Sequence, residues 1–285
     1  MRDLGTDTAV AGGGGRYSGA LHEGWDIWGP QGGYVAGIAL RAAAAESAFR
    51  RPASFTCHFL RPARLGAIEL RVESLRQTRR AESLRVACTQ GGASVLDAVV
   101  WIVDELSGLD HDAAESPDVP PPEAVQPWEE YLPGGQVPFP FWSNFDVRPV
   151  RPEPAGWTRA GDPRFLAWMR LRSRPDLDDP FVDAARMLAV ADSSMFPAAT
   201  LAHDGGFPYI APSLDLTVSF HRIGEGSEWL LVDGLAPLSE RGLVSGSASV
   251  WSSDGRLLAT AKQQMLQRPE RQPSAARMNE PTTSR

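Results

Sequence analysis

Cysteine, basic residues and long apolar runs are scarce in this chain of 285 residues, and each scarcity excludes a class of protein. The two cysteines, Cys57 and Cys88, lie in strand-like segments without C-x-x-C spacing, so we expect buried free thiols rather than a disulfide or metal site. No run approaches the roughly 18 apolar residues that a membrane-spanning helix requires. Lys and Arg number 28 against 35 Asp and Glu, and they are scattered rather than gathered in a basic stripe. The sequence therefore predicts a protein that binds neither nucleic acid nor a membrane.

Motifs of several common enzyme and export classes are missing as well. Residues 1–15 contain a glycine quartet at 12–15 instead of a charged and then an apolar segment, so we expect no signal peptide and a cytoplasmic location. The quartet follows no strand and lacks the Lys-Ser/Thr ending of a phosphate loop, which favours a flexible leader. There is no G-x-S-x-G motif, and the histidines show no zinc-ligand spacing. An α/β-hydrolase esterase and a zinc enzyme are both disfavoured.

What the sequence does contain is one pattern of a helix and several strands that occurs twice. The first set is predicted as a strand within 16–28, a helix at 34–47 and strands at 54–60, 67–75, 81–89 and 94–103. The second set is predicted as strands at 145–150 and 164–172, a helix at 181–201, and strands at 214–220, 229–235, 242–251 and 256–266. Pro197 is expected to kink the second helix or to end it.

Composition divides the chain into five parts. Eight prolines occur among acidic residues between positions 105 and 140, and proline removes backbone donors, so this segment is predicted to be an exposed connector. The end of the chain is polar and contains proline, which is typical of disorder. The predicted parts are a leader at 1–15, a first unit at 16–105, a connector at 106–137, a second unit at 138–268 and a disordered tail at 269–285.

The two sets are copies of one unit, because a single shift aligns them. Residues 55–61 align with 216–222, and Thr56 corresponds to Thr217, an offset of 217 − 56 = 161. The same offset relates Leu70 to Leu231, Arg80 to Arg241, Leu96 to Leu257 and Ala98 to Ala259. We therefore predict an α+β tandem double hotdog, in which two curved antiparallel sheets each wrap a long helix and join edge to edge, removing two exposed edges. Two unrelated α+β domains are the alternative.

The two copies differ where chemistry could occur. Gln31, Gly32 and Gly33 stand directly before the first helix, where glycines allow a ligand to approach the backbone closely. The free N–H groups and positive dipole end of that helix would suit a developing oxyanion. A simple turn at the start of a helix explains the same residues.

An acidic residue interrupts the apolar face of the second helix. Asp192 lies on the same helical face as Leu188, Met195 and Ala199, and a buried carboxylate requires hydrogen-bonding partners. Such a group could act as a general base on water or as a nucleophile. The alternative is a structural Asp that caps the helix after the kink.

The last strand contains a second polar residue among apolar ones. Leu257, Ala259, Ala261 and Met265 alternate onto one face, which Gln263 shares. This amide could orient a water or a carboxylate, or it could bond a backbone carbonyl. On an earlier strand, Ser213 begins a polar row and is the candidate hydroxyl.

These residues, in this order, resemble the double-hotdog acyl-CoA thioesterases of the type II group, and especially their actinobacterial relatives. The resemblance rests on 28–34 (WGPQGGY), 59–62 (FLRP), 191–192 (AD), 214–215 (LD), 220–222 (FHR), 228–231 (EWLL), 254–255 (DG) and 259–263 (ATAKQ). It covers the chain from about residue 16 to 268.

The resemblance implies hydrolysis of acyl-CoA thioesters to free acid and CoA, without metal or organic cofactor. By position it assigns Asp192, Ser213 and Gln263 to activation of water, and the segment Gln31, Gly32, Gly33 and Tyr34 to the substrate carbonyl. Gln31 stands where the family often has His, and Ser213 where Thr is common. The alternatives are a hotdog hydratase or dehydratase and a non-catalytic acyl-CoA-binding protein. Whether the pseudo-dimers assemble into a homo-oligomer is left open.

Overall fold

The computed structural model describes residues 2–105, 107–150, 152–153, 156–157, 161–203, 208–224 and 226–269. The predicted tail lies outside these residues except for Pro269, which ends the short strand β16 (Arg268–Pro269). None of the described helices is long and apolar enough to cross a membrane.

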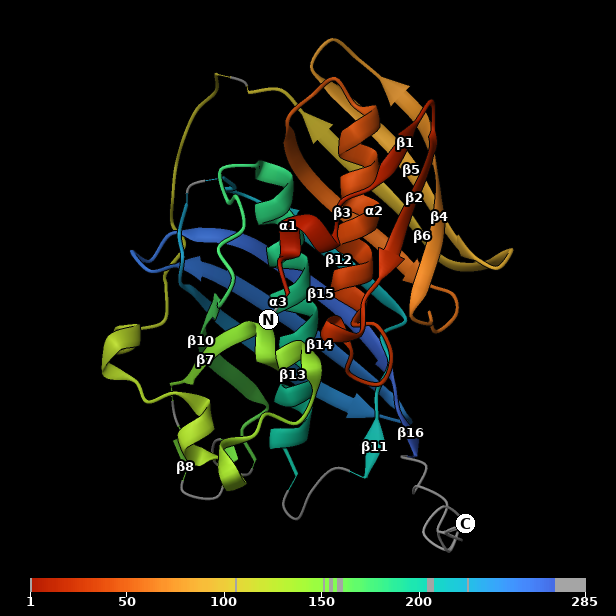
Figure 1. Ribbon diagram of the computed structural model, residues 1–285. Coiled ribbons are helices and arrows are strands. Elements are labelled where there is room, and N and C mark those ends of the chain that lie inside the picture. The colour runs from red at the N-terminus through yellow and green to blue at the C-terminus, as the bar shows by residue number, and fades with distance from the viewer. Residues whose placement is uncertain are drawn as a thin grey trace, which may run out of the picture.

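One antiparallel sheet of twelve strands forms the frame of the described chain (Figure 1). Across the sheet the strands are β1 (Ala11–Gly13), β2 (Arg16–Leu21), β4 (Gly66–Gln77), β5 (Ala81–Gln90), β6 (Ala93–Val103), β3 (Arg51–Phe59), β12 (Asp215–Phe220), β15 (Leu257–Leu266), β14 (Leu243–Ser252), β13 (Leu230–Glu240), β10 (Arg164–Leu171) and β7 (Phe145–Pro149). Two small ribbons accompany it, β8 (Pro152–Glu153) with β9 (Gly156–Trp157) and β11 (Tyr209–Ile210) with β16. The predicted strands are confirmed, with ends that differ by a few residues.

The two copies of the repeat meet at the centre of this sheet, where β3 pairs with β12. In this pairing Thr56 lies opposite Thr217, and these are the two residues that the offset of 161 relates to each other. A residue that pairs with its own equivalent lies on a local two-fold axis. The seam therefore relates the two halves of the sheet by pseudo-symmetry.

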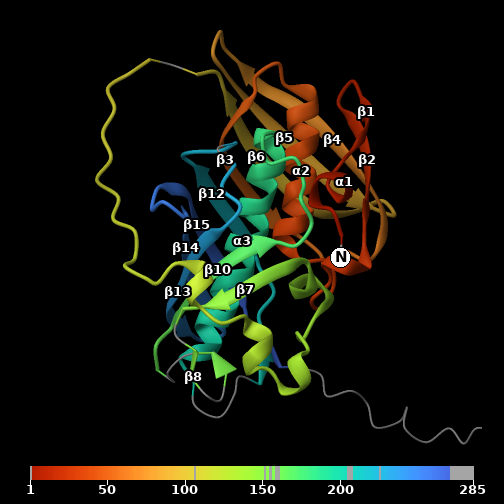
Figure 2. The ribbon, with the colours of Figure 1, turned by 60° about the vertical axis from the view of Figure 1, so that its left-hand side comes forward.

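Each half of the sheet carries one helix on its inner face (Figure 2). The helix α2 (Gly32–Glu46) packs against β2 to β6, and α3 (Pro180–Leu201) packs against β10, β13, β14 and β15. Both begin at a side-chain cap: Gln31 accepts the N–H of Tyr34, and Asp179 accepts the N–H groups of Phe181 and Val182. Pro197 does not end α3, because Ala198, Ala199 and Leu201 beyond it are buried and hold the last turn in the core.

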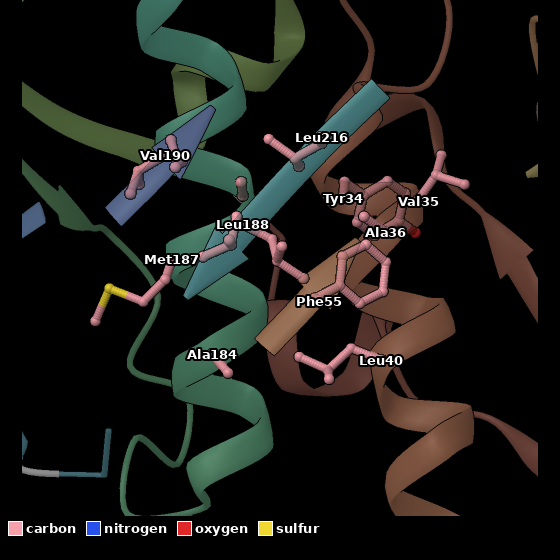
Figure 3. Packing of buried hydrophobic residues seen from close by; sticks show 14 of the residues in the cluster. Tyr34, Val35, Ala36, Leu40, Phe55, Ala184, Met187, Leu188, Val190 and Leu216 are labelled. Atoms are coloured by element: carbon pink, nitrogen blue, oxygen red, sulfur yellow. The ribbon is translucent and has the colours of Figure 1, made fainter. Parts of the chain in front are cut away.

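The two helices pack directly on each other, with glycines at the closest contacts. A Cβ atom on Gly33 would lie 2.2 Å from the carbonyl oxygen of Leu188, and one on Gly37 would lie 3.1 Å from the Cβ atom of Ala185. Side chains of both helices then meet those of the seam strands: Leu40 and Leu188 point toward Phe55 of β3, and Leu188 lies on the side of Leu216 of β12 (Figure 3). Only glycine allows this spacing, so the helix pair fixes where the start of α2 lies.

The expected flexible leader is wrong for the described residues. A short helix, α1 (Leu4–Asp7), begins at the cap Asp3, and Leu4 is fully buried. Asp7 is also buried and accepts hydrogen bonds from the Arg2 guanidinium and from the indole N–H of Trp25. An apolar anchor and a buried carboxylate with two partners hold this segment on the core. The strand expected across 16–28 ends at Leu21 and is followed by a 3-10 turn, Glu23–Trp25.

The connector is not exposed throughout. Val125 and Trp128 are buried, and the indole N–H of Trp168 on β10 donates to the carbonyl of Pro120 at 2.9 Å. Val125 belongs to a small second core on the outer face of the sheet, with Leu166, Trp168, Trp229, Leu231 and Trp251. Short 3-10 turns, suited to proline at their first positions, shape this part of the chain: Pro122–Ala124, Trp128–Tyr131, Pro133–Gly135 and Pro140–Asn144. Apolar residues among the prolines thus pack a segment that composition alone assigned to solvent.

Candidate active site

Asp192 lies in the second half of α3, where the helix passes the start of α2, and only 8% of it is exposed. Its oxygen Oδ1 accepts hydrogen bonds from the hydroxyl of Ser213, at 3.0 Å, and from the amide of Gln263. Its oxygen Oδ2 accepts from the amide of Gln31, at 2.5 Å, and from the backbone N–H of Gly33, at 2.9 Å. One oxygen is therefore held by the second copy of the repeat and the other by the first.

These four donors occupy the acceptor positions of a carboxylate, which number about four. They also exclude the capping alternative, because Asp192 accepts from the N-terminus of α2 and not from its own helix. Burial raises the pKa of Asp192, and the hydrogen bonds from Gly33, Ser213, Gln263 and Gln31 lower it without cancelling the effect of burial. The result is a buried carboxyl group with a raised pKa, held from four sides.

Gln263 reaches this carboxylate from β15. It is 2% exposed, and its Nε2 also donates to the hydroxyl oxygen of Ser213 at 2.6 Å. Its Oε1 is buried and has no hydrogen-bond partner among the described residues. The predicted alternation onto the inner face is right for Ala259, Ala261 and Met265 but wrong for Leu257, because the register shifts before Ala259 and Leu257 packs on the outer core.

Ser213 reaches Asp192 because it lies outside the regular strand. It precedes β12 and forms an isolated bridge with Met265. The residues that continue its polar row behave differently: Thr217 is exposed, and Asp215 accepts the backbone N–H of Gln264. The sequence pattern placed all of them on one face, and only the irregular start of the strand turns Ser213 inward.

Gly32 and Gly33 have different tasks. The N–H of Gly33 is used by Asp192, and the carbonyl oxygen of Leu188 leaves no room for a side chain. Gly32 lines the cavity next to Asp192, and its N–H has no hydrogen-bond partner within the described chain. The donor that faces the cavity at the positive end of α2 is therefore Gly32.

Tyr34 does not reach the cavity with its side chain. Its ring stacks on Trp25 at 5.2 Å, and its hydroxyl lies 3.0 Å from the carbonyl oxygens of Asp7 and Ala20. Its contribution to the site is the N–H that bonds Oε1 of Gln31 and so orients that amide toward Asp192. The side chain predicted to help bind the substrate carbonyl is thus absent from the lining of the cavity, and the backbone of Tyr34 contacts Gln31 instead.

A cavity of about 430 Å³ opens beside Asp192. It runs along one face of α3, from Asp192 to Thr200, and its walls are mainly apolar. Six aromatic residues line it: Trp28, Phe59, Trp128, Phe139, Trp142 and Phe196. Sequence reasoning missed this wall, because three of the six lie in or near the proline-rich connector. The large aromatic residues of that segment were the available signal, since exposed linkers seldom carry them.

The pseudo-symmetric position contains none of these polar groups. The strand offset of 161 relates Ser213 to Pro52 (213 − 161). Ser213 bridges Met265 as Pro52 pairs with Ile102, so Gln263, two residues before Met265, corresponds to Val100. The helix caps give an offset of 179 − 31 = 148, which relates Asp192 to Ala44. Carboxylate, hydroxyl and amide are thus all absent from the second position, and the described chain forms this arrangement once.

No histidine in the described chain hydrogen-bonds to Asp192, and His221 bonds Thr260 instead. Across the same residues, no group of three His, Cys, Asp or Glu side chains comes close enough to hold a metal ion. The chemistry available at the site is that of a carboxylate, two amides, a hydroxyl and a helix N-terminus.

Comparison with solved structures defines the class of fold. A conserved protein with a hot dog fold from Alicyclobacillus acidocaldarius superposes with a TM-score of 0.80 at 24% identity, covering 94% of this chain and 98% of that one. A putative thioesterase II from Thermobifida fusca gives 0.78 at 22% identity, with 94% and 98% covered. The tesB protein of Mycobacterium avium subspecies paratuberculosis gives 0.77 at 24% identity, with 93% and 98% covered. The chain has a hot dog fold.

Family models identify the chain more closely. Residues 21–103 match the N-terminal domain of the acyl-CoA thioesterases, and residues 114–267 match their C-terminal domain. This chain belongs to the acyl-CoA thioesterase family. A search of curated protein sequences found no match.

Proposed function

We propose that this protein hydrolyses acyl-CoA thioesters to a carboxylic acid and CoA at one site between the two units of a tandem double hotdog. The observation that carries the proposal is the buried carboxylate of Asp192, held by donors from both units beside an apolar cavity. The pairing of β3 with β12 supports two sheets joined edge to edge, with units at about 16–105 and 138–268.

In the proposed reaction, Asp192 is the general base. A water that replaces the Ser213 hydroxyl at Oδ1 gives its proton to the carboxylate and attacks the thioester carbonyl carbon. Ser213 is the donor to be displaced, because it lines the cavity and is only partly buried. The Gln263 amide orients the water, since its oxygen lacks a protein partner and can accept the second hydrogen.

The negative charge that develops on the carbonyl oxygen needs a donor in the cavity. The N–H of Gly32 is suited to this role, because the N–H of Gly33 is engaged by Asp192. When the tetrahedral intermediate collapses, the carbon–sulfur bond breaks and the proton held by Asp192 passes to the leaving thiolate. The products are the acid and CoA with a free thiol, and the carboxylate is restored.

The direct test is to measure thiol release from short, medium, long and aromatic acyl-CoAs. Thiol release that saturates with substrate supports hydrolysis. A hotdog hydratase would instead remove the conjugation of an enoyl-CoA without releasing thiol. A binding protein without catalysis would retain acyl-CoA and release nothing. Either of these two results would replace the proposal.

The pH dependence of kcat/KM follows from the raised pKa of Asp192. A general base works in its ionised form, so activity should be complete above this pKa and fall tenfold per pH unit below it. We expect the midpoint of the acid limb to lie above about 3.9, the ordinary value for Asp. Rates measured between about pH 4 and 8 test this, after stability has been checked over the same range. A midpoint at or below the ordinary value would contradict the buried base.

Gln263 and its neighbour Gln264 form a matched pair on β15. Gln263→Ala removes a donor from Asp192 and should lower kcat by about 10-fold to 100-fold, because a hydrogen bond to a charged group contributes about 1.5–3 kcal/mol. Gln264 bonds Ser245 on the other face of the strand, at 3.0 Å, so Gln264→Ala should leave kcat unchanged. Steady-state rates of both variants decide the matter, and equal losses would show that the effect comes from the strand and not from the site.

A further inference from the structure

The cavity beside Asp192 has a neighbour on the far side of the connector. A second hollow, of about 770 Å³, lies between the connector and the first unit, where Arg2, Leu21, Leu65 and Val137 contribute to its lining. The two spaces share two residues, Pro138 and Phe139, and no others. Pro138 and Phe139 therefore form a partition between them.

Phe139 is held in this partition by other aromatic residues. Its ring meets that of Trp28 edge-on, with 6.2 Å between centroids, and Trp28 meets Phe196 of α3 edge-on at 4.7 Å. All three line the cavity. Phe139 is half-buried and precedes the 3-10 turn Pro140–Asn144, where its carbonyl accepts the N–H of Trp142 at 3.2 Å. These contacts join the start of the second unit to Trp28 of the first unit and, through it, to α3, so the ring has a fixed place.

Two arginines among the residues that line the cavity are suited to the charged part of CoA. Arg61 follows β3, and Arg268 follows β15. The segment that precedes β12 lies between the ends of these two strands. The backbone N–H of Phe59 donates to the carbonyl of Leu214, and the backbone N–H of Leu266 donates to the carbonyl of Pro212. The two arginines therefore lie along one edge of the sheet, where guanidinium groups can bind phosphates. An acyl-CoA whose phosphates bind these arginines would place its acyl group among the aromatic residues that line the cavity.

We propose that Phe139 is a specificity-determining residue that limits the length of the acyl chain. The inference rests on the proposed hydrolysis and adds to it the substrate class: acyl groups that end at the aromatic partition. In the native protein, a longer chain meets the Phe139 ring. With the ring removed, the chain would continue into the second hollow, where Leu21, Leu65 and Val137 provide apolar surface beside the polar side chains of Arg2, His22, Glu23, Ser143 and Asn144.

The test compares kcat/KM for dodecanoyl-CoA with kcat/KM for hexanoyl-CoA in the native protein and in Phe139→Ala. The ratio of the two values should rise at least tenfold in the variant, since each additional buried methylene group contributes about 0.8 kcal/mol, or about fourfold. Phe139→Leu should give an intermediate rise, and Phe139→Trp should lower the ratio. These two variants keep an apolar side chain in the partition and so test the inference if the alanine variant does not fold.

Two further variants test whether the effect of Phe139→Ala comes from joining the cavity to the second hollow or only from enlarging the cavity. Val137→Ala alters the second hollow without touching the cavity, so its ratio should equal that of the native protein. Phe196→Ala widens the cavity from the α3 side and leaves the partition in place, so its ratio should rise less than that of Phe139→Ala. An unchanged ratio in Phe139→Ala, or an equal rise in Phe196→Ala, would overturn the inference. Absence of thiol release from every acyl-CoA would instead overturn the proposed hydrolysis.

Discussion

Replacing Asp192 by Asn should lower kcat by about 10²-fold to 10⁴-fold, the contribution of a positioned general base. Asn has nearly the shape of Asp and cannot take a proton from water. One of the two carboxylate oxygens also becomes an NH₂ group, which cannot accept hydrogen bonds. The two donors on that side, either Ser213 and Gln263 or Gln31 and Gly33, then lose their acceptor. The variant is therefore expected to keep the fold while losing both the base and part of the network that orients it.

Asp97 offers a matched control for this change. Its carboxylate pairs with Arg85 on the outer face of the sheet, away from the cavity, with 31% of the side chain exposed. Asp97→Asn should leave kcat unchanged. Rates are measured with the acyl-CoA on which the native protein is most active, and the two variants are compared by circular dichroism. Near-native turnover in Asp192→Asn would reject the mechanism.

Gly33→Ala should lower the free energy of unfolding by at least about 2 kcal/mol, and with it the activity of the protein that remains folded. The new methyl group would lie 2.2 Å from the Leu188 carbonyl oxygen and 2.8 Å from the Cα atom of Ala189, so the backbones of α2 and α3 must separate. Overpacking of this kind costs about 1–3 kcal/mol or more. The same displacement draws the Gly33 N–H away from Asp192.

Alanine substitutions at two other glycines provide a comparison for the loss of stability expected in Gly33→Ala. In Gly37→Ala the new methyl group comes no closer than 3.1 Å, to the Cβ atom of Ala185, so this change should cost less. Gly13→Ala meets nothing within 4 Å and should change stability little. Thermal or urea unfolding of the three variants gives the order. If Gly33→Ala and Gly13→Ala had equal stability, the close helix contact would not be the constraint on this position.

Sequence reasoning succeeded where a residue broke a regular pattern. Asp192 and Gln263 are polar residues at positions where the pattern of apolar residues predicts a buried face. Such a pattern can be recognised in a sequence because side chains of helices and strands return to the same face at fixed intervals. The offset of 161 was equally visible in the sequence, although the loops differ in length, with two residues between β5 and β6 and four between β14 and β15. The pairing of Thr56 with Thr217 then follows from the symmetry that such a repeat allows.

What sequence reasoning missed depends on contacts between distant segments. Periodicity could not show that the N–H of Gly33 is taken by a carboxylate about 160 positions away, leaving Gly32 to face the cavity. Nor could it assign the connector, where proline conceals the burial of Trp128 and Phe139 does not belong to any repeating face. The bulge beside Leu257 is a local irregularity of the same kind, decided by packing on both sides of the sheet.

The apolar residues at the pseudo-equivalent position, Ala44, Pro52 and Val100, show what a fused chain permits. In a dimer of identical subunits, every substitution appears at both sites at once, so neither can change without the other. Joining the two subunits in one polypeptide removes that restriction. One half can then hold a buried carboxylate while the other presents the start of its helix to it. Asymmetry of this kind is open to a fused chain and closed to a dimer of identical subunits.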